Sequence, residues 1–435
     1  MSTRFALVRN ATGVKLKPSP FIFRNTQTLQ TATKAILDSN AGRDPERLTL
    51  KFAAMRADPF AFFRATCPLF YSTLPLARSL KVSPNVLACG DLHLENFGSY
   101  KGNNRLVYFD VVDFDESCVA PVAFELVRLL TSMLVGARPL NISASTASKM
   151  VNHFVQCYAA NVMAAKPRWV ERSLATGPVR KLLQSLKGRH RCDLIKQRTF
   201  RKSGKIRLLN DGKKSLAIAS TDRTHAESIL AAYASTQRSP AFFEPIDIAR
   251  RVAGSGSLGL ERYVALVRGD GSVDGQYLID IKIANASALA ASIKLPQPRW
   301  KSEAERVVSI QRVSQAIFPA LLGSVRIGSQ SYVIKELAPT TDRVNLVSLA
   351  GKSAALIDVV QTMAETTAWG HLRGCSRFGA APVETLADFV RRDDWHRQLI
   401  CCADAAHELV SGQWEKFSMD YDTDPEGLVS ALFPA

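Results

Sequence analysis

Three glycines at positions 254, 256 and 259 separate two segments that are rich in β-branched and aromatic residues. The run GSGSLG has the spacing G-x-G-x-x-G, which two unrelated nucleotide-binding architectures share. A dinucleotide-binding fold requires a helix directly after the glycines. The segment that follows here, ERYVALVRG, is rich in strand-forming residues and ends in a turn, so it predicts a strand. A strand–loop–strand flap is therefore expected, the alternative being an ordinary β-turn with extra glycine.

A flap of this kind is suited to holding phosphate groups. Because glycine has no side chain, backbone N–H groups in the loop can approach phosphate oxygens closely. The residues expected to make this contact are Gly254, Ser255, Gly256, Ser257 and Gly259.

Lys282 lies on the next predicted strand, 276–284, within the apolar run LIDIKIA. An ammonium group in such a strand is costly unless it reaches a partner, and phosphates above the glycine loop would be that partner. The helix predicted in SEAERVVSIQRVSQAI carries Glu303 and Glu305, either of which could hold Lys282 in place or be a surface charge. The candidate nucleotide-site residues therefore include Glu305, and also Glu336 in the hairpin predicted in GSVRIGSQSYVIKEL.

Carboxylates are crowded into a short stretch of a chain whose net charge is +17. CGDLHLENFG covers residues 89–98 and FDVVDFDES covers residues 109–117, and both include the end of a predicted short strand. Phosphoryl transfer needs a base that orients the attacking hydroxyl and divalent cations that offset phosphate charge. Mg²⁺ takes oxygen ligands, usually one or two side chains together with phosphates and waters. The crowding is explained if metal ions and a nucleotide lie between these carboxylates.

The spacing within these stretches indicates separate roles. Asp91 and Asn96 have the spacing of a catalytic base and a metal ligand, and Asp113 has the position of a second metal ligand. Asp115 is a further candidate ligand or a turn residue. His93 is grouped with the catalytic residues, where bracing of the loop is favoured over titration. An Asx-rich turn before a helix cap would explain Asp113 or Asp115 alone, but not the glycine flap and strand lysine in the same chain.

GDLHLEN followed by DFDES resembles the catalytic loop and metal motif of aminoglycoside phosphotransferases and related small-molecule kinases. The order of motifs more closely resembles an uncharacterised bacterial family, DUF2252. The stretches that carry this resemblance span about residues 45–340 and are DPFAFFRA, GDLHLENFG, FDVVDFDE, RVAGSGSLG, YLIDIKIA and RVVSIQRVSQ.

The resemblance implies an α+β, two-lobed, protein-kinase-like fold that is circularly permuted, because the catalytic loop precedes the glycine loop. It implies that Asp91 is the catalytic base, that Asn96 and Asp113 bind Mg²⁺, and that Lys282 holds the α- and β-phosphates of ATP beneath the glycines. The metal motif ends in Asp115 where kinases carry glycine, so switching by an activation loop is not implied.

The expected order of domains follows from the permuted kinase-like fold that the resemblance implies. An N-terminal extension is expected at 1–45, and the first part of the helical lobe, with the catalytic loop and metal motif, at 46–235. A small antiparallel β-rich lobe with one helix and the glycine loop is expected at 236–340, and the second part of the helical lobe at 341–435.

The segment 166–214 holds sixteen Lys and Arg but only three acidic residues. Such a patch attracts nucleic acid, nucleotide phosphates, acidic lipid or an acidic partner, and the alternative is a solvated helical face. No run approaches the roughly 20 apolar residues of a membrane helix, and the first residues lack the apolar run of a secretory signal. A cytoplasmic protein is therefore expected. The eight cysteines show no C-x-x-C spacing, which argues against zinc and disulfide frameworks.

The expected function is an ATP- and Mg²⁺-dependent phosphotransferase that acts on a hydroxyl of an unknown small-molecule acceptor. Two alternatives remain open: transfer of a nucleotidyl (AMP) group, with ATP reversed in the same site, and a non-catalytic nucleotide- or nucleic-acid-binding scaffold. The C-terminal helices, from about residue 344, would line the acceptor side, where the candidates are Trp369, His371, Asp393, Asp394 and Asp420.

Overall fold

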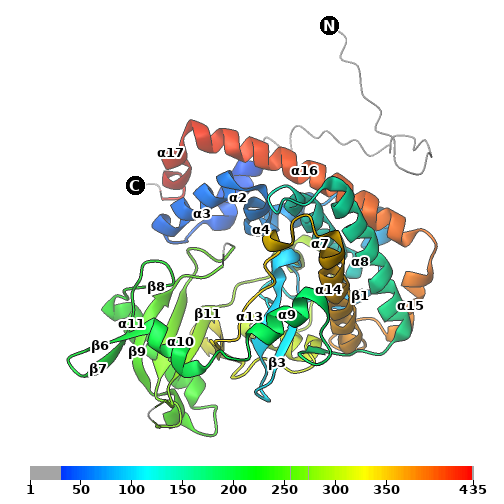
Figure 1. The fold of residues 1–435 in the computed structure, drawn as a ribbon. Coiled ribbons are helices and arrows are strands. Elements are labelled where there is room, and N and C mark those ends of the chain that lie inside the picture. The colour runs from blue at the N-terminus through cyan, green and yellow to red at the C-terminus, as the bar shows by residue number, and fades with distance from the viewer. Residues whose placement is uncertain (1–30, 255, 273, 434–435) are drawn as a thin grey trace.

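The computed structural model describes residues 31–254, 256–272 and 274–433, and it has an α+β fold with a helical region and a β-rich region (Figure 1). Four long helices dominate the helical region: α7 (Val122–Ala137), α8 (Ala144–Ala164), α14 (Ser353–Gly374) and α16 (Trp395–Thr423). Shorter helices surround them: α2 (Ala32–Asn40), α3 (Pro45–Ala57), α4 (Pro59–Ala65), α5 (Cys67–Thr73), α6 (Arg78–Lys81), α9 (Gly177–Ser185), α15 (Val383–Arg391) and α17 (Pro425–Ser430).

The β-rich region is built on one antiparallel sheet with the strand order β12-β13-β11-β10-β9-β8. Its strands are β8 (Ser215–Leu216), β9 (Pro245–Arg251), β10 (Arg262–Val267), β11 (Tyr277–Ile283), β12 (Gly323–Ile327) and β13 (Gln330–Glu336). Strand β11 lies inside the sheet, where Lys282 pairs with Arg262 on one side and with Val333 on the other. After β11 the chain forms α12 (Ala288–Ser292) and α13 (Glu303–Ser314) before it returns to the sheet as β12.

The two faces of this sheet pack against different elements because side chains alternate along each strand. Tyr277, Ile279 and Ile281 share a hydrophobic cluster with helix α11 (Ser220–Ala234). On the other face, Leu278 packs with residues of α10 (Arg191–Arg198) and of the hairpin formed by β6 (Thr199–Lys202) and β7 (Lys205–Leu208).

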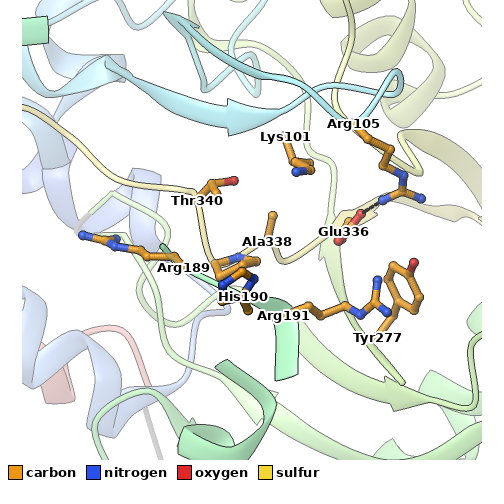
Figure 2. Close-up of a pocket in the computed structure, with 10 residues that line it drawn as sticks. Lys101, Arg105, Arg189, His190, Arg191, Tyr277, Glu336, Ala338 and Thr340 are labelled. Carbon is orange, nitrogen blue, oxygen red and sulfur yellow. Dashed lines mark hydrogen bonds and ion pairs between the residues drawn. The ribbon is translucent and has the colours of Figure 1, made fainter. Parts of the chain in front are cut away.

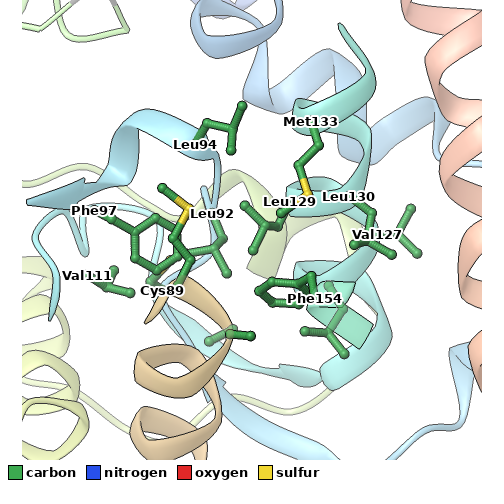
Figure 3. Packing of buried hydrophobic residues seen from close by; sticks show 14 of the residues in the cluster. Cys89, Leu92, Leu94, Phe97, Val111, Val127, Leu129, Leu130, Met133 and Phe154 are labelled. Carbon is green, nitrogen blue, oxygen red and sulfur yellow. The ribbon is translucent and has the colours of Figure 1, made fainter. Parts of the chain in front are cut away.

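The core of the helical region supports a short loop that follows β1 (Asn85–Ala88). Strand β1 pairs with β4 (Cys118–Pro121), and β2 (Phe97–Lys101) pairs with β3 (Val107–Val111), which also pairs with β5 (Val170–Glu171). Leu92 and Leu94 point from the loop toward Leu129 and Met133 of α7 (Figure 3). Leu92, His93 and Leu94 are buried, whereas Asp91 and Glu95 on either side of them remain partly exposed.

Sequence signals fix the start of several helices that frame the loops. The Asp44 side chain accepts a hydrogen bond from the Arg47 N–H at 3.0 Å and caps α3, and Asp58 caps α4 in the same way. In both helices proline occupies the first turn, where its missing N–H costs nothing. Pro59 therefore ends one helix and begins the next, as its position in the sequence predicted.

The strands predicted on both sides of the glycine loop, the hairpin before residue 337 and the helix after Pro121 are present. Residues 46–235 were expected to form the first part of the helical lobe, and the end of this range differs from that expectation. Strand β8 joins the main sheet and α11 packs on it, so the β-rich region begins before residue 236. Strands β6 and β7 have only four residues each, and half of their side chains are basic, so the apolar signal for these strands is short and weak.

The expected N-terminal extension, residues 1–45, lies mainly outside the described residues, which include only its last part with α2. None of the helices in the described part of the chain is long and apolar enough to cross a membrane. All eight cysteines are free thiols.

Candidate active site

The loop at residues 89–96, called the acid loop below, is fixed from beneath by a buried carboxylate. The Glu125 Oε1 of α7 accepts hydrogen bonds from the N–H groups of Cys89 at 2.7 Å and Gly90 at 3.1 Å. Its Oε2 contacts the His371 Nε2 of α14 at 2.7 Å, and the His371 Nδ1 lies 2.9 Å from the Tyr158 hydroxyl of α8. Burial raises the pKa of Glu125, but hydrogen bonds and charge from His371 outweigh it, so the pKa is lowered. Three helices thus hold the start of the loop.

Gly90 is required by the geometry of the turn. Its φ of 83° lies in the left-handed region, which residues with a Cβ rarely adopt. A Cβ at this position would lie 1.9 Å from the Glu116 carbonyl oxygen. The loop and the segment after Asp113 therefore approach each other more closely than any side chain would permit.

Asp91 is held by a buried arginine. The Asp91 Oδ1 accepts a hydrogen bond from the Arg128 Nε at 2.6 Å, and the Arg128 side chain is fully buried while that of Asp91 is 25% exposed. The Arg128 guanidinium stacks on aromatic rings, with its centre 4.3 Å from the Phe63 ring and 4.8 Å from the Phe70 ring. Burial raises the pKa of Asp91 above its ordinary value, and the charge of Arg128 opposes this.

Asn96 joins the acid loop to Asp113. Its Nδ2 donates to the carbonyl oxygens of Asp91 at 3.0 Å and Asp113 at 3.2 Å, which turns its Oδ1 away from these carbonyls. Burial opposes ionisation of Asp113, but the charges of Lys282 and Lys335 outweigh it and lower the pKa of this carboxyl. Asn96 and Asp113 are therefore neighbours that both offer oxygen atoms.

His93 has a bracing geometry. Its Nδ1 accepts the Glu95 N–H at 3.1 Å, and its ring meets the Phe60 ring edge-on. Burial, followed by the charges of Arg64 and Arg128, lowers the pKa of His93 well below its ordinary value. The neutral ring acts as an acceptor inside the loop.

Lys282 contacts a carboxylate of the segment that follows β3. Its ammonium forms an ion pair with the Asp115 carboxylate, although the two residues are 167 positions apart. Burial lowers the pKa of Lys282, and the charge of Asp113 opposes this. Arg306 of α13 reinforces the junction, since it donates to the Asp115 carbonyl at 3.0 Å and to the Ser117 carbonyl. The sheet and α13 are thus joined to the segment after β3, which Asn96 of the acid loop also contacts through the Asp113 carbonyl.

The glycine loop rests on the start of α3. The Arg43 Nη1 donates to the carbonyl oxygens of Gly256 at 2.7 Å and Leu258 at 3.0 Å, and the buried Lys51 Nζ lies 3.3 Å from the same Gly256 oxygen. Gly259 has a φ of 83°, and a Cβ there would lie 2.9 Å from the Arg43 Cβ. Ser255, which the sequence placed in this loop, lies outside the described residues.

A charged network covers the sheet face next to Lys282. Asp280 accepts two hydrogen bonds from Arg262, at 2.8 Å and 2.5 Å, and forms an ion pair with Arg251 at 2.5 Å. Burial opposes the ionisation of Asp280, but these arginines outweigh it and lower its pKa far below the usual range. Lys335 lies on the neighbouring strand, where Asp280 pairs with it across the sheet.

Two predicted contacts are replaced by others. Glu305 accepts the Lys301 N–H at the start of α13, and Glu303 pairs with Arg306 at 2.6 Å, so neither is the ion-pair partner that the structure gives Lys282. A carboxylate one turn into a helix is drawn to its free N–H groups, which explains the position of Glu305. Glu336 pairs with Arg105 and lines a separate pocket (Figure 2).

His371, an acceptor-side candidate, is instead buried against Glu125, as described above. Trp369 is also buried, and its Nε1 donates to the Asn161 side chain at 3.0 Å. Asp420 pairs with Lys416 and Thr33 at the other end of the helical region. These three side chains have structural partners that the sequence alone did not reveal.

The residues that position the site were missed because each lies far along the chain from the loop it holds. A signal existed for two of them. Glu125 and Arg128 lie three residues apart in α7, whose remaining residues are almost all apolar. Two opposite charges on the buried face of a helix need partners, which is a reason to look for a polar site there.

Among the described residues, no three His, Cys, Asp or Glu side chains lie close enough together to hold a metal ion by themselves. Any bound cation would have to complete its coordination with Asn96, with water or with a ligand. Mg²⁺ commonly binds in this way, through one or two protein oxygens together with phosphates.

The similarity to a known family covers most of the chain. A family model described as an uncharacterized protein conserved in bacteria (DUF2252) matches residues 43–420. No curated protein and no solved structure matches the chain. The matched range includes the acid loop, the glycine loop, Lys282 and the α7 residues that hold the acid loop. The chain therefore belongs to the DUF2252 family of uncharacterised bacterial proteins.

Proposed function

We propose that the protein is an ATP- and Mg²⁺-dependent phosphotransferase that acts on a hydroxyl group of a small molecule. The observation that carries this proposal is the ion pair between Lys282 and Asp115, with Asp113 alongside. It joins a strand lysine to the segment after β3, where the Asp113 carbonyl accepts a hydrogen bond from Asn96 of the acid loop. Phosphoryl transfer requires these groups together, because its catalysis consists mainly of positioning and charge stabilisation.

The order of elements in the β-rich region supports a kinase-like fold. Two strands flank the glycine loop, the third carries Lys282, a helix follows, and a hairpin completes an antiparallel sheet. A protein kinase has its glycine loop, strand lysine and helix in the same order. The acid loop precedes these elements here, which is why we propose a circularly permuted arrangement of the two lobes.

The residues fit the phosphate groups and the metal. Asn96 Oδ1 and the Asp113 carboxylate would supply two oxygen ligands to Mg²⁺, which would offset the charge on the transferred phosphoryl group. Lys282 would exchange Asp115 for phosphate oxygens, and the glycine loop would cover them. Asp91, whose Oδ1 is bound by Arg128, would accept the proton of the acceptor hydroxyl on Oδ2. His93 would keep the loop in shape.

Nucleotidyl transfer is the second candidate, and the charged network around Asp280 favours it. The sheet face that carries Lys282 also carries Arg251, Arg262 and Lys335. Such a face would suit phosphate groups better than a purine ring. A nucleotide bound in the reverse direction would present its α-phosphate to the acceptor.

Labelled ATP tests the proposal and separates the two transfers. The protein is incubated with Mg²⁺, a panel of amino-sugars, nucleosides and amino-alcohols, and ATP labelled at either the γ- or the α-phosphate. Label passing from the γ-position supports phosphoryl transfer, and label passing from the α-position supports nucleotidyl transfer. Asp91→Asn is expected to reduce turnover by about 10²- to 10⁴-fold while nucleotide binding persists. Full turnover in this variant would rule out Asp91 as the base.

A further inference from the structure

A second charged site lies between the β2–β3 hairpin and the segment before α10. The cavity has a volume of about 340 Å³, and Figure 2 shows the side chains that line it from both sides. Lys101 and Arg105 come from the hairpin, whereas Arg189 and Arg191 come from the basic segment 166–214. Binding pockets for small molecules begin at about this volume.

The positive charge of this cavity is only partly balanced. Glu336 pairs with Arg105, and Arg189 pairs with Asp342 at 2.8 Å. Within the described residues, neither Lys101 nor Arg191 has a carboxylate within 4.0 Å. Like charges in a concave site repel each other and raise the local concentration of anions. The cavity is thus suited to an anion that contacts both Lys101 and Arg191.

The Arg191 side chain is preorganised for contact with an anion. Its guanidinium lies 3.7 Å from the centre of the Tyr277 ring, and one of its terminal nitrogens donates to the Asp274 carbonyl at 3.1 Å. Its Nε is buried and has no hydrogen-bond partner. A buried donor without a partner is costly unless a ligand satisfies it. Stacking on an aromatic ring holds the guanidinium plane and leaves its edge free to bind phosphate or carboxylate.

The hairpin also shows backbone strain at this point. Arg105 has a φ of 69°, which is uncommon for a residue with a long side chain. Neighbouring Asn103 and Asn104 would tolerate that conformation more readily. The strained conformation directs the Arg105 side chain to Glu336 and Tyr277, with its guanidinium 5.6 Å from the ring centre. Strain of this kind is concentrated at ligand sites.

This cavity is separate from the site around Lys282. Tyr277 and Lys282 belong to the same strand, β11, and lie five residues apart. An odd separation places them on opposite faces of the sheet, and the rise of a strand puts them about 17 Å apart. A phosphate group bound by Lys282 therefore does not occupy this cavity.

We propose that this cavity binds a small phosphorylated molecule that carries at least two negative charges. Its volume suits a compound of that size, and its position between two parts of the fold excludes a nucleic acid duplex. The basic segment 166–214 thereby gains a defined role for two of its arginines. Because the lining comes from both the helical and the β-rich regions, the bound molecule would bridge them.

Inorganic pyrophosphate is the probe that tests this proposal. Isothermal titration calorimetry is performed on the full chain with EDTA present, which prevents metal-dependent binding near Asp113. The wild type is expected to bind, and Arg191→Gln and Lys101→Gln are each expected to weaken binding by about tenfold, because each removes a charge-assisted contact. Exposed Arg377→Gln is the matched control and is expected to bind like the wild type.

The Lys282→Met variant separates this proposal from the proposed function. If the cavity is the site, Lys282→Met binds pyrophosphate as the wild type does. No measurable binding at millimolar pyrophosphate would overturn the proposal. So would binding that Lys282→Met abolishes while Arg191→Gln retains it, since pyrophosphate would then occupy the site around Lys282.

Discussion

The acid loop and the glycine loop are held in different ways. Buried side chains from three helices fix the acid loop, and two of these carry full charges, Glu125 and Arg128. The glycine loop is held mainly from one side, through backbone carbonyls that accept from Arg43 and Lys51. Asp91 and Asn96 of the acid loop are therefore held rigidly, whereas the hydrogen bonds of the glycine loop can be exchanged for others at small cost in free energy.

This difference suits a transfer reaction. Catalytic carboxylates must keep their geometry through the reaction, because a small displacement lowers the rate strongly. A loop that covers phosphates must open to admit and release the nucleotide. The comparison predicts that substitutions beneath the acid loop affect stability strongly, whereas those at the glycine loop affect ligand binding and local opening.

Arg128→Met is expected to have the largest effect on stability. It leaves Asp91 partly buried without its cation, which should cost about 3–5 kcal/mol of unfolding free energy. Urea unfolding followed by circular dichroism measures this loss. Arg138→Met, an exposed position just after the same helix, is the matched control and should change stability by less than about 0.5 kcal/mol. Equal effects of both substitutions would contradict the rigid support.

Glu125→Ala comes next. It removes the acceptor of the Cys89 and Gly90 N–H groups, which should cost about 3 kcal/mol of unfolding free energy. Glu125→Gln keeps an oxygen in the same position and is expected to restore much of that loss. If both variants unfold at the same urea concentration as the wild type, the loop does not depend on this carboxylate.

The pH dependence of the unfolding free energy tests whether the half-buried carboxyl group of Glu116, near the acid loop, is protonated in the folded protein. Burial raises the pKa of Glu116 from 4.5 to about 7, against a hydrogen bond from the Ala288 N–H. The folded protein holds this proton more tightly than the unfolded chain does, so the contribution is full below about pH 4.5 and is lost as pH rises to about 7. Allowing for partial exposure, the loss is roughly 2 kcal/mol.

Unfolding of the wild type and of Glu116→Gln at pH 4.5 and pH 8 measures this contribution by difference. The variant is needed because burial also raises the pKa of Asp110, to about 6, so Asp110 contributes to the pH dependence of the wild type in the same range. A difference between the two proteins that stays constant across this range would show that Glu116 does not titrate there.

Arg43→Gln is expected to have the smallest effect on global stability, about 1–2 kcal/mol, because it removes two partly buried hydrogen bonds to backbone carbonyls. Local opening should change more than stability. Hydrogen exchange of the amides at 256–260 is expected to become faster, while exchange of those at 89–96 stays the same. Faster exchange in both loops would mean that they open together, which would contradict the comparison.

Much of the β-rich region could be predicted because its signals are local. Glycines at 254 and 259 need positive φ angles, and the segments beside them have strand-forming residues. The helix that carries Glu305 was also predicted, but the role of this residue was not, because a helix cap and a lysine partner call for the same residue type.

The support of the acid loop could not be predicted in the same way. Its start depends on a chain of contacts from Glu125 through His371 to Tyr158, each on a different helix. Helix periodicity shows which side chains are buried but not which helices face each other. The pocket at Arg191 depends likewise on a crossing between two regions, which no local pattern specifies.

Binding of Mg-ATP to the full chain shows whether the acid loop and Lys282 form one nucleotide site. Isothermal titration calorimetry compares the wild type with Lys282→Met, and with Lys294→Met as an exposed control. If the acid loop and Lys282 do form one site, binding is expected to depend on Mg²⁺ and to weaken by about tenfold or more in Lys282→Met only. No heat of binding at millimolar Mg-ATP in the wild type, or equal affinity in Lys282→Met, would contradict it.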